Sequence, residues 1–209
     1  IRDSLNVYTT PHGRNRIIDI IGDLGGFAFE DYDSECENSF ANENGDRYIT
    51  CLNADLTLSD PEYIVATPRG NWTGKTKGGL ILSKDCGSTW ERLSMPRGLS
   101  EFIDQKLDNI EKPNVDSGWT AISADGKRIM WAVAGGRGFS NKAVCYTDDE
   151  GKTWQKSIFM DSNGNSADEH NVKIFSDYYN SDLFFAIAER ENLGLYISRD
   201  KGATFREVS

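Results

Sequence analysis

The sequence has 209 residues and a mass of 23.3 kDa, enough for one large domain or two small ones with a buried core. Its 33 acidic and 23 basic residues give a formal net charge of -10, which repels a phosphate backbone, so nucleic acid is not an expected partner. No stretch approaches the roughly 20 apolar residues of a membrane span, so no membrane is expected either.

The chain begins with Ile-Arg-Asp, without an initiator Met or an apolar leader, so we interpret it as a piece of a longer protein. The start of the sequence therefore does not indicate a compartment. Twenty glycines and 11% aromatic residues, with few long apolar runs, favour a sheet protein rich in turns.

The first informative segment is the apolar run at 17–21, a predicted strand, followed by Gly-Asp-Leu-Gly-Gly-Phe at 22–27. Asp23 thus lies at a strand end, two residues before a Gly-Gly pair. One interpretation is a tight turn in which the Asp side chain bonds its own loop. The other is a catalytic acid presented by that turn.

The four cysteines have no Cys-x-x-Cys spacing, and the chain has two histidines, so no zinc or other metal site is expected. A disulfide between Cys36 and Cys51 and four free thiols are both compatible with the sequence.

Trp72 lies in the glycine-rich segment 69–79, where a core residue would be unusual. An exposed flat ring in such a segment is a candidate ligand-binding residue, with incidental exposure as the alternative. Trp119, just before a predicted strand, is a weaker candidate of the same kind. Residues 71–73 also fit a glycosylation acceptor.

Residues 99–112 form the one segment with helical periodicity, and we expect that helix in a connection between sheets.

One eight-residue pattern, Ser/Thr-x-Asp-x-Gly-x-Thr-aromatic, occurs at 83–90, 147–154 and 198–205. We call it the eight-residue repeat. The Asp can accept bonds from its own loop, the Gly supplies a positive φ, and the closing aromatic re-enters the core, so each copy predicts a hairpin turn. The aromatic residues Trp90, Trp154 and Phe205, and Trp131 in a predicted strand, are expected in the core.

Predicted strands flank each repeat, among them one at 155–159 after the second copy, and the intervals between repeats suit four-stranded units with variable loops. The fold class is therefore all-β, a β-propeller of four-stranded antiparallel blades. We expect residues 1–209 to be a single segment of about four blades of a seven-bladed propeller, with the remaining blades outside this chain or in another chain, because an open ring would expose strand edges.

The eight-residue repeat resembles the Asp box (BNR repeat) of sialidases, Vps10-type receptors and xyloglucan-active glycosidases. Along nearly the whole chain the order of landmarks resembles the second propeller of the family-74 glycoside hydrolases, the xyloglucan-cleaving endo-β-1,4-glucanases. The most specific landmarks are 22–27 and Ile-Ser-Ala-Asp-Gly-Lys-Arg-Ile-Met-Trp at 122–131. This sequence continues with Ala-Phe-Glu-Asp after Phe27, where the family has Arg-His-Asp-Asp.

The resemblance implies a secreted, extracellular polysaccharide-degrading enzyme that needs no cofactor and acts on xyloglucan or another β-glucan by inverting acid/base hydrolysis. It places the general acid at Asp23 and the base in another propeller, so the isolated chain is expected to be incomplete. The other residues expected near substrate are Gly25, Gly26, Phe27, Trp72 and Trp119.

Two alternatives stay open. The chain could be a non-catalytic propeller that binds polysaccharide or a protein partner through the same scaffold. A Vps10-like receptor is the third interpretation, and it predicts a cysteine-rich segment downstream of Ser209. Sialidase chemistry is not expected, because the arginines are scattered.

Overall fold

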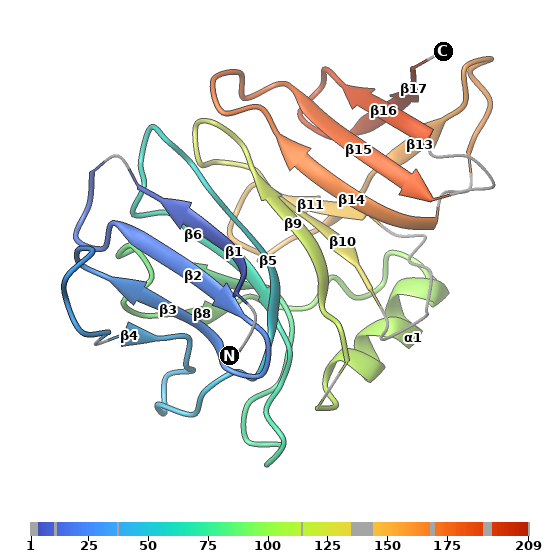
Figure 1. Cartoon of the computed structure of the whole chain (residues 1–209). Coiled ribbons are helices and arrows are strands. Elements are labelled where there is room, and N and C mark those ends of the chain that lie inside the picture. The colour runs from blue at the N-terminus through green and yellow to red at the C-terminus, as the bar shows by residue number, and fades with distance from the viewer. Residues whose placement is uncertain are drawn as a thin grey trace.

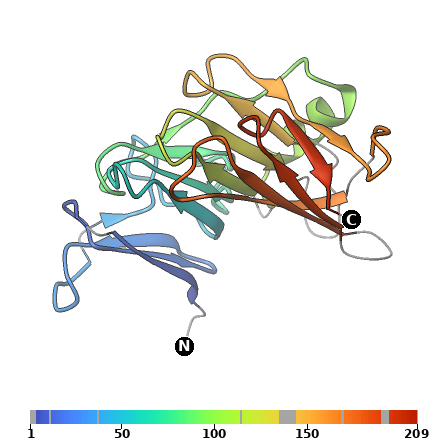
Figure 2. The same cartoon turned by 90° about the horizontal axis from the view of Figure 1, so that it is seen from above.

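The structure is a computed structural model that describes residues 4–10, 12–36, 38–113, 115–134, 144–167, 170–189 and 194–208. The described chain forms four sheets in sequence order, side by side in Figure 1, and their strands are antiparallel except for one parallel pair in the fourth sheet. Figure 2 shows the first sheet at one end of the row and the sheet with the C-terminus toward the other.

The four sheets contain all seventeen strands of the described chain. The first sheet contains β1 (Ser4–Thr9), β2 (Ile17–Ile21), β3 (Gly25–Phe29) and β4 (Asn38–Ser39). The second contains β5 (Cys51–Leu56), β6 (Ile64–Pro68), β7 (Ile81–Ser83) and β8 (Glu91–Arg92). The third contains β9 (Gly118–Ile122), β10 (Ile129–Val133), β11 (Val144–Thr147) and β12 (Gln155–Lys156). The fourth contains β14 (His170–Ser176), β15 (Phe184–Glu189), β16 (Gly194–Ser198) and β17 (Thr204–Glu207), with β13 (Ile158–Met160) beside β17.

The strand expected at 155–159 after the second repeat is split, which corrects the sequence-based prediction. Its first half is β12 of the third sheet, whereas β13 pairs in parallel with β17 of the fourth sheet. Between them the buried Ser157 donates from Oγ to the Gly202 carbonyl at 2.7 Å, which ties the chain to the next sheet.

Apolar layers fill the spaces between neighbouring sheets. Ile18 and Ile20 of β2 pack toward the second sheet, and Trp131 of β10 is fully buried between the second and third sheets. Met130 and Ala132 of the same strand face the fourth sheet, as strand alternation requires.

The helix α1 (Glu101–Ile110) lies in the connection from the second to the third sheet, as the sequence predicted. Ser100 caps it by accepting a bond from the Ile103 amide, and Ile103, Leu107 and Ile110 form its buried stripe.

The eight-residue repeats are hairpin turns, as predicted. In the second copy Asp149 accepts bonds from the Thr153 amide at 2.8 Å, the Thr153 hydroxyl at 2.7 Å and the Thr147 hydroxyl at 2.7 Å. In each copy the residue before the Gly also has a positive φ, as Glu150 does at 57°, so the left-handed bend extends over two residues. Trp90 and Phe205 are buried and Trp154 is half-buried.

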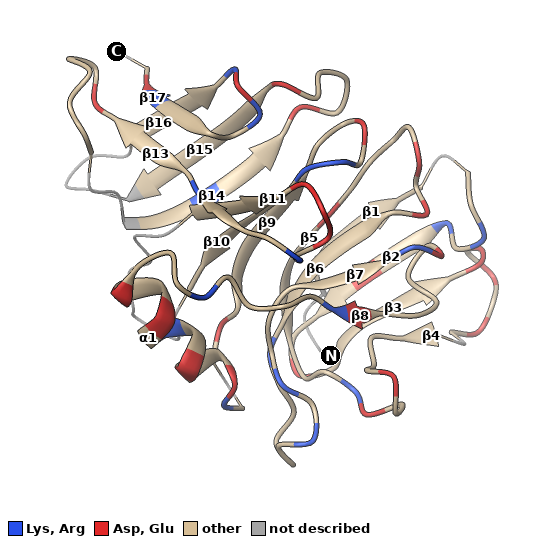
Figure 3. Cartoon of the chain, turned by 180° about the vertical axis from the view of Figure 1, so that it is seen from behind, with Lys and Arg blue, Asp and Glu red and all other residues tan. Residues whose placement is uncertain are grey.

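The loops fall on two sides, because alternate connections of an antiparallel sheet lie at opposite ends. The repeat side carries the eight-residue repeats and the β5–β6, β9–β10 and β14–β15 loops. The connector side carries the β2–β3 turn, the β6–β7 loop and α1. Charged residues lie mainly in these loops and on α1, with both signs interspersed (Figure 3).

Candidate functional site

Asp23 occupies the tip of the tight turn between β2 and β3. It is exposed and has a left-handed backbone with φ 64°, a conformation that Asp and Asn tolerate better than most residues. Its amide donates to Thr50 Oγ1 at 3.1 Å, which anchors the turn to the start of the second sheet. Within the described chain the Asp23 carboxylate has no hydrogen bond or ion pair, so it is available to a ligand on the connector side.

Gly25 and Gly26, which follow Asp23, are buried, and close packing explains why both positions are glycine. A Cβ on Gly25, where φ is 77°, would meet the Tyr48 carbonyl oxygen at 2.8 Å. A Cβ on Gly26 would meet the Asp19 carbonyl oxygen at 2.8 Å and the Phe40 ring at 2.9 Å. Phe27 is half-buried, with its ring centroid 6.4 Å from that of Phe29. Contact of these three residues with substrate stays a prediction.

Trp72 is 66% exposed in the β6–β7 loop, on the same side of the sheets as Asp23. The loop is held by Asn71, whose Oδ1 accepts from the Thr73 hydroxyl at 2.7 Å and from the Thr76 amide at 3.2 Å. Neither Asp23 nor Trp72 lines the cavities that surround Asp55, Arg128, Tyr48 and Arg206.

Trp119 lies apart from that pair, in a cavity of about 270 Å³ between the inner strands β1, β5, β9 and β14. We call this the axial cavity. Its main lining side chains are Tyr8, Asn53, Asp55, Trp119, Phe175 and Tyr178.

The Asp55 side chain connects three of the inner strands by hydrogen bonds. One carboxylate oxygen accepts from the Ile122 amide of β9 at 2.9 Å and from the Ser176 hydroxyl of β14 at 2.8 Å. The other accepts from the Leu56 amide at 2.9 Å. Asn53 acts similarly, because its Oδ1 accepts from the Thr120 amide at 2.6 Å. These side-chain hydrogen bonds join the inner strands of neighbouring sheets, which do not pair with one another through backbone hydrogen bonds in the described chain.

The electrostatics of the axial cavity follow from its burial. Burial raises the pKa of Asp55 to about 6, although its hydrogen bonds act in the opposite direction. Burial also raises the pKa of Tyr8 and Tyr178, and the charge of Asp55 adds to both shifts. The sequence interpretation missed Asp55, yet polar residues at 53 and 55 within an otherwise apolar strand sequence are a signal that could have found it.

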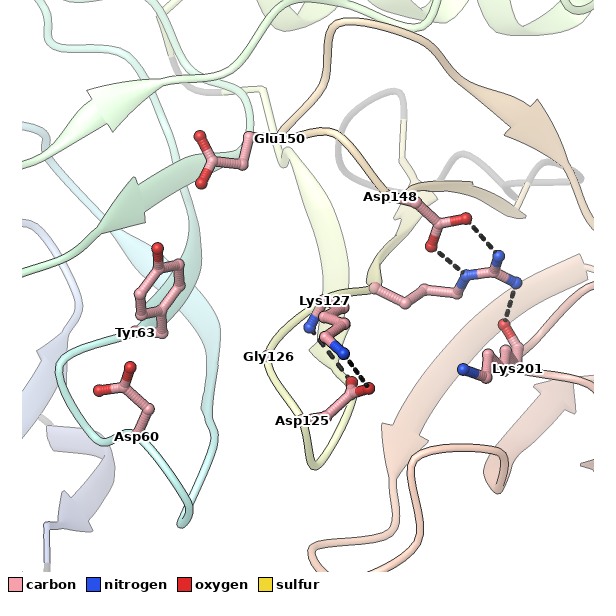
Figure 4. A pocket seen from close by; sticks show the side chains of 9 residues that line it. Asp60, Tyr63, Asp125, Gly126, Lys127, Asp148, Glu150 and Lys201 are labelled. Carbon is pink, nitrogen blue, oxygen red and sulfur yellow. Dashed lines mark hydrogen bonds and ion pairs between the residues drawn. The ribbon is translucent and has the colours of Figure 1, made fainter.

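A larger pocket of about 530 Å³ lies on the repeat side (Figure 4). Two ion pairs form within its lining, and the larger one involves Arg128. Arg128 reaches both carboxylate oxygens of Asp148 at 2.7 and 2.5 Å and donates to the Lys201 carbonyl at 2.7 Å. Lys127 lies 3.8 Å from Asp125, and Glu150 bonds Lys84 at 2.6 Å. Most of the charged side chains that line this pocket are therefore held in ion pairs.

All four cysteines are free thiols, with Cys36 exposed and the other three buried. In the described ranges there is no group of three or more His, Cys, Asp or Glu side chains placed to hold a metal ion. No helix among the described residues is long and apolar enough to cross a membrane.

The sequence comparison gives one informative relative, while no protein-family profile matches the chain. A xyloglucanase from a Paenibacillus species is 23% identical over 207 residues, which cover 98% of this chain and 17% of that protein. The chain is similar to one part of a xyloglucanase. The resemblance to xyloglucan-active enzymes predicted from the sequence is thereby confirmed.

Comparison with solved structures gives the same similarity. A family-74 xyloglucanase from Xanthomonas campestris matches with a TM-score of 0.69 and 20% identity, over 99% of this chain and 24% of that one. A family-74 enzyme from Niastella koreensis matches with a TM-score of 0.64 and 18% identity, again over 99% and 24%. The four sheets are therefore a β-propeller segment, and the chain spans about a quarter or less of each relative.

Proposed function

We propose that this chain is part of a glycoside hydrolase that cleaves the β-1,4-glucan backbone of xyloglucan or a related plant polysaccharide, with Asp23 as the general acid. The similarity to a xyloglucanase over 98% of the chain supports the enzyme class. The observation that carries the role of Asp23 is its unpartnered carboxylate at the exposed tip of the β2–β3 turn. A general acid must reach a glycosidic oxygen of a bound chain, and a turn tip allows that.

In the proposed reaction Asp23 gives its proton to the departing glycosidic oxygen as the bond to the anomeric carbon breaks. A water attacks that carbon from the opposite face and loses its proton to a second carboxylate. Inversion requires the two carboxyl groups to be about 6.5–9.5 Å apart. We expect the second carboxylate from another propeller of the parent protein.

The test is Asp23→Asn in the parent enzyme, because Asn keeps the left-handed turn while removing the acid. We expect turnover of xyloglucan to fall by about 10²–10⁴-fold. An aryl glucoside with an acidic leaving group needs no proton, so its turnover should fall much less. The control is Glu150→Asn, another acid with a left-handed backbone, which is half-buried on the repeat side and pairs with Lys84. Unchanged xyloglucan turnover in Asp23→Asn would refute the acid role.

A second candidate is a non-catalytic propeller that binds polysaccharide. It is favoured by the exposed Trp72. Loss of turnover in Asp23→Asn with full retention on xyloglucan would exclude this candidate.

We also propose that further blades of the parent protein, or another chain, cover the two end sheets, and that the protein acts outside the cell, where its polysaccharide lies. Apolar side chains point outward at both ends, including Val7 at 51% exposure on β1 and Leu195 at 45% on β16. Limited proteolysis of the parent with and without its flanking sequence tests this covering. Equal protection of both forms would contradict it.

A further inference from the structure

The axial cavity has a rigid polar floor. Asp55 and Asn53 are buried and fixed by bonds to the neighbouring inner strands, so their oxygens do not have to be ordered when a ligand arrives. A carboxylate offers about four acceptor sites, and three donors occupy those of Asp55. The oxygen that accepts only the Leu56 amide keeps capacity for one more donor.

The walls of the cavity are aromatic. Trp119 and Phe175 meet edge to face with centroids 6.0 Å apart, and Tyr178 stands at the rim with 44% of its surface exposed. The indole Nε1 of Trp119 is buried without a hydrogen-bond partner in the described chain. Buried donors are nearly always satisfied, so this one indicates a missing acceptor.

We infer that the axial cavity is a binding site for one neutral sugar residue, separate from Asp23. Aromatic faces suit the C–H surface of a sugar ring, the free capacity of Asp55 suits a hydroxyl donor, and the Trp119 indole suits a hydroxyl acceptor. The volume lies just below the roughly 300 Å³ at which small-molecule sites begin, which favours one sugar ring over an oligosaccharide.

An organic ammonium ion is the main competitor, because aromatic rings beside a carboxylate also bind cations. Two observations favour the sugar. Lys173 already places its Nζ 5.1 Å from the Trp119 ring centroid, so a second cation there would be repelled. An ammonium ion also has no lone pair for the Trp119 indole.

The test is a titration of the 209-residue chain with glucose and, separately, xylose and choline, followed through the indole N–H signals of its five tryptophans by NMR. Trp119→Phe assigns the Trp119 signal. We expect glucose or xylose to shift that signal saturably and to leave the signal of the buried Trp131 in place. A Trp119 signal that no sugar moves, or that only choline moves, would overturn the inference.

The neighbouring tyrosines provide a matched pair of variants. Tyr178→Ala removes a lining ring and should weaken sugar binding about tenfold. Tyr179, which is 89% exposed and does not line the cavity, should tolerate Ala with no change in affinity. Equal effects of the two changes would contradict the site, provided that both variants unfold at the wild-type temperature.

The inference does not require Asp23 to be catalytic. Asp23→Asn should bind the sugar as the wild type does, and loss of binding in that variant would count against a separate axial site. An active parent enzyme carrying Asp23→Asn would refute the proposed acid and leave the axial cavity unaffected.

Discussion

Two aspartates of this chain have opposite surroundings. Asp23 stands at a turn tip on the connector side, exposed and without a partner for its carboxylate among the described residues. Asp55 lies in an inner strand, buried, with its carboxylate bonded to three donors from three strands. The first can approach a ligand from outside, whereas the second connects the sheets that surround the axial cavity.

A raised carboxyl pKa and accessibility to a polymer substrate belong to different aspartates in this chain. A raised pKa is a frequent mark of a catalytic acid, yet here burial raises the pKa of the connecting residue, Asp55. Asp23, by contrast, is exposed at a turn tip where a polymer can reach it. We therefore propose the acid role for Asp23 and a structural role for Asp55, and the following changes test that assignment.

Removing the Asp55 side chain should have the largest effect on stability. Asp55→Ala leaves two buried amides and a hydroxyl without their acceptor, so we expect the free energy of unfolding to fall by about 2–4 kcal/mol. Asp23→Asn should change it by less than about 0.5 kcal/mol, because the turn is exposed and Asn tolerates its backbone. Urea denaturation measures both. Equal losses of unfolding free energy in the two variants would contradict the different structural roles of the two aspartates.

The pH dependence of stability should distinguish Asp55 next. Its folded-state pKa of about 6 lies above the ordinary value of 3.8, so the folded state keeps a proton that the unfolded state releases. This contribution is complete below pH 3.8 and is lost as the pH rises through 6, by up to about 3 kcal/mol. The stability of the wild type relative to Asp55→Asn should therefore decrease between pH 4 and pH 7. A difference that stays constant would contradict the shift.

The Gly-Gly pair tests how firmly the Asp23 turn is held. Gly26→Ala places a methyl group against the Asp19 carbonyl and the Phe40 ring, so we expect a loss of about 1–3 kcal/mol in thermal unfolding. Gly74→Ala is the control, because Gly74 has φ 73° and no atom within 4 Å of an added Cβ. Its cost should come from the left-handed backbone alone, about 1–2 kcal/mol. A silent Gly26→Ala would mean that the turn relaxes freely.

Trp72 should have the smallest effect on folding. Trp72→Ala should change the free energy of unfolding by less than about 0.5 kcal/mol, because the ring is exposed. If the connector side receives the polysaccharide, this variant of the parent protein should be retained several-fold less on immobilised xyloglucan. Tyr32→Ala is the matched control, since Tyr32 is 77% exposed on the repeat side. Equal retention of both variants would remove Trp72 from the site.

The sequence predicted much of the architecture because its strongest signals are local. The three repeats combine a loop-bonding Asp, a left-handed Gly and a core aromatic within eight residues, and the structure has a hairpin at each. The helix near 99–112 was equally readable, because a capping Ser and a buried stripe lie within one segment. The split of the predicted strand at 155–159 was not, because β13 takes its partner from β17, over forty residues later.

The candidate site also has features that depend on adjacent residues and features that depend on tertiary packing. The sequence alone determined that Asp23 ends a strand beside a Gly-Gly pair, since turn chemistry depends on adjacent residues. Only the tertiary structure decided that the two glycines are packed inward, that Trp119 lies in a different cavity from the Asp23 turn, and that Asp55 joins three strands. Those facts depend on which strands become neighbours in space, and residues as distant in the chain as Asp55 and Ser176 meet only after the sheets have packed.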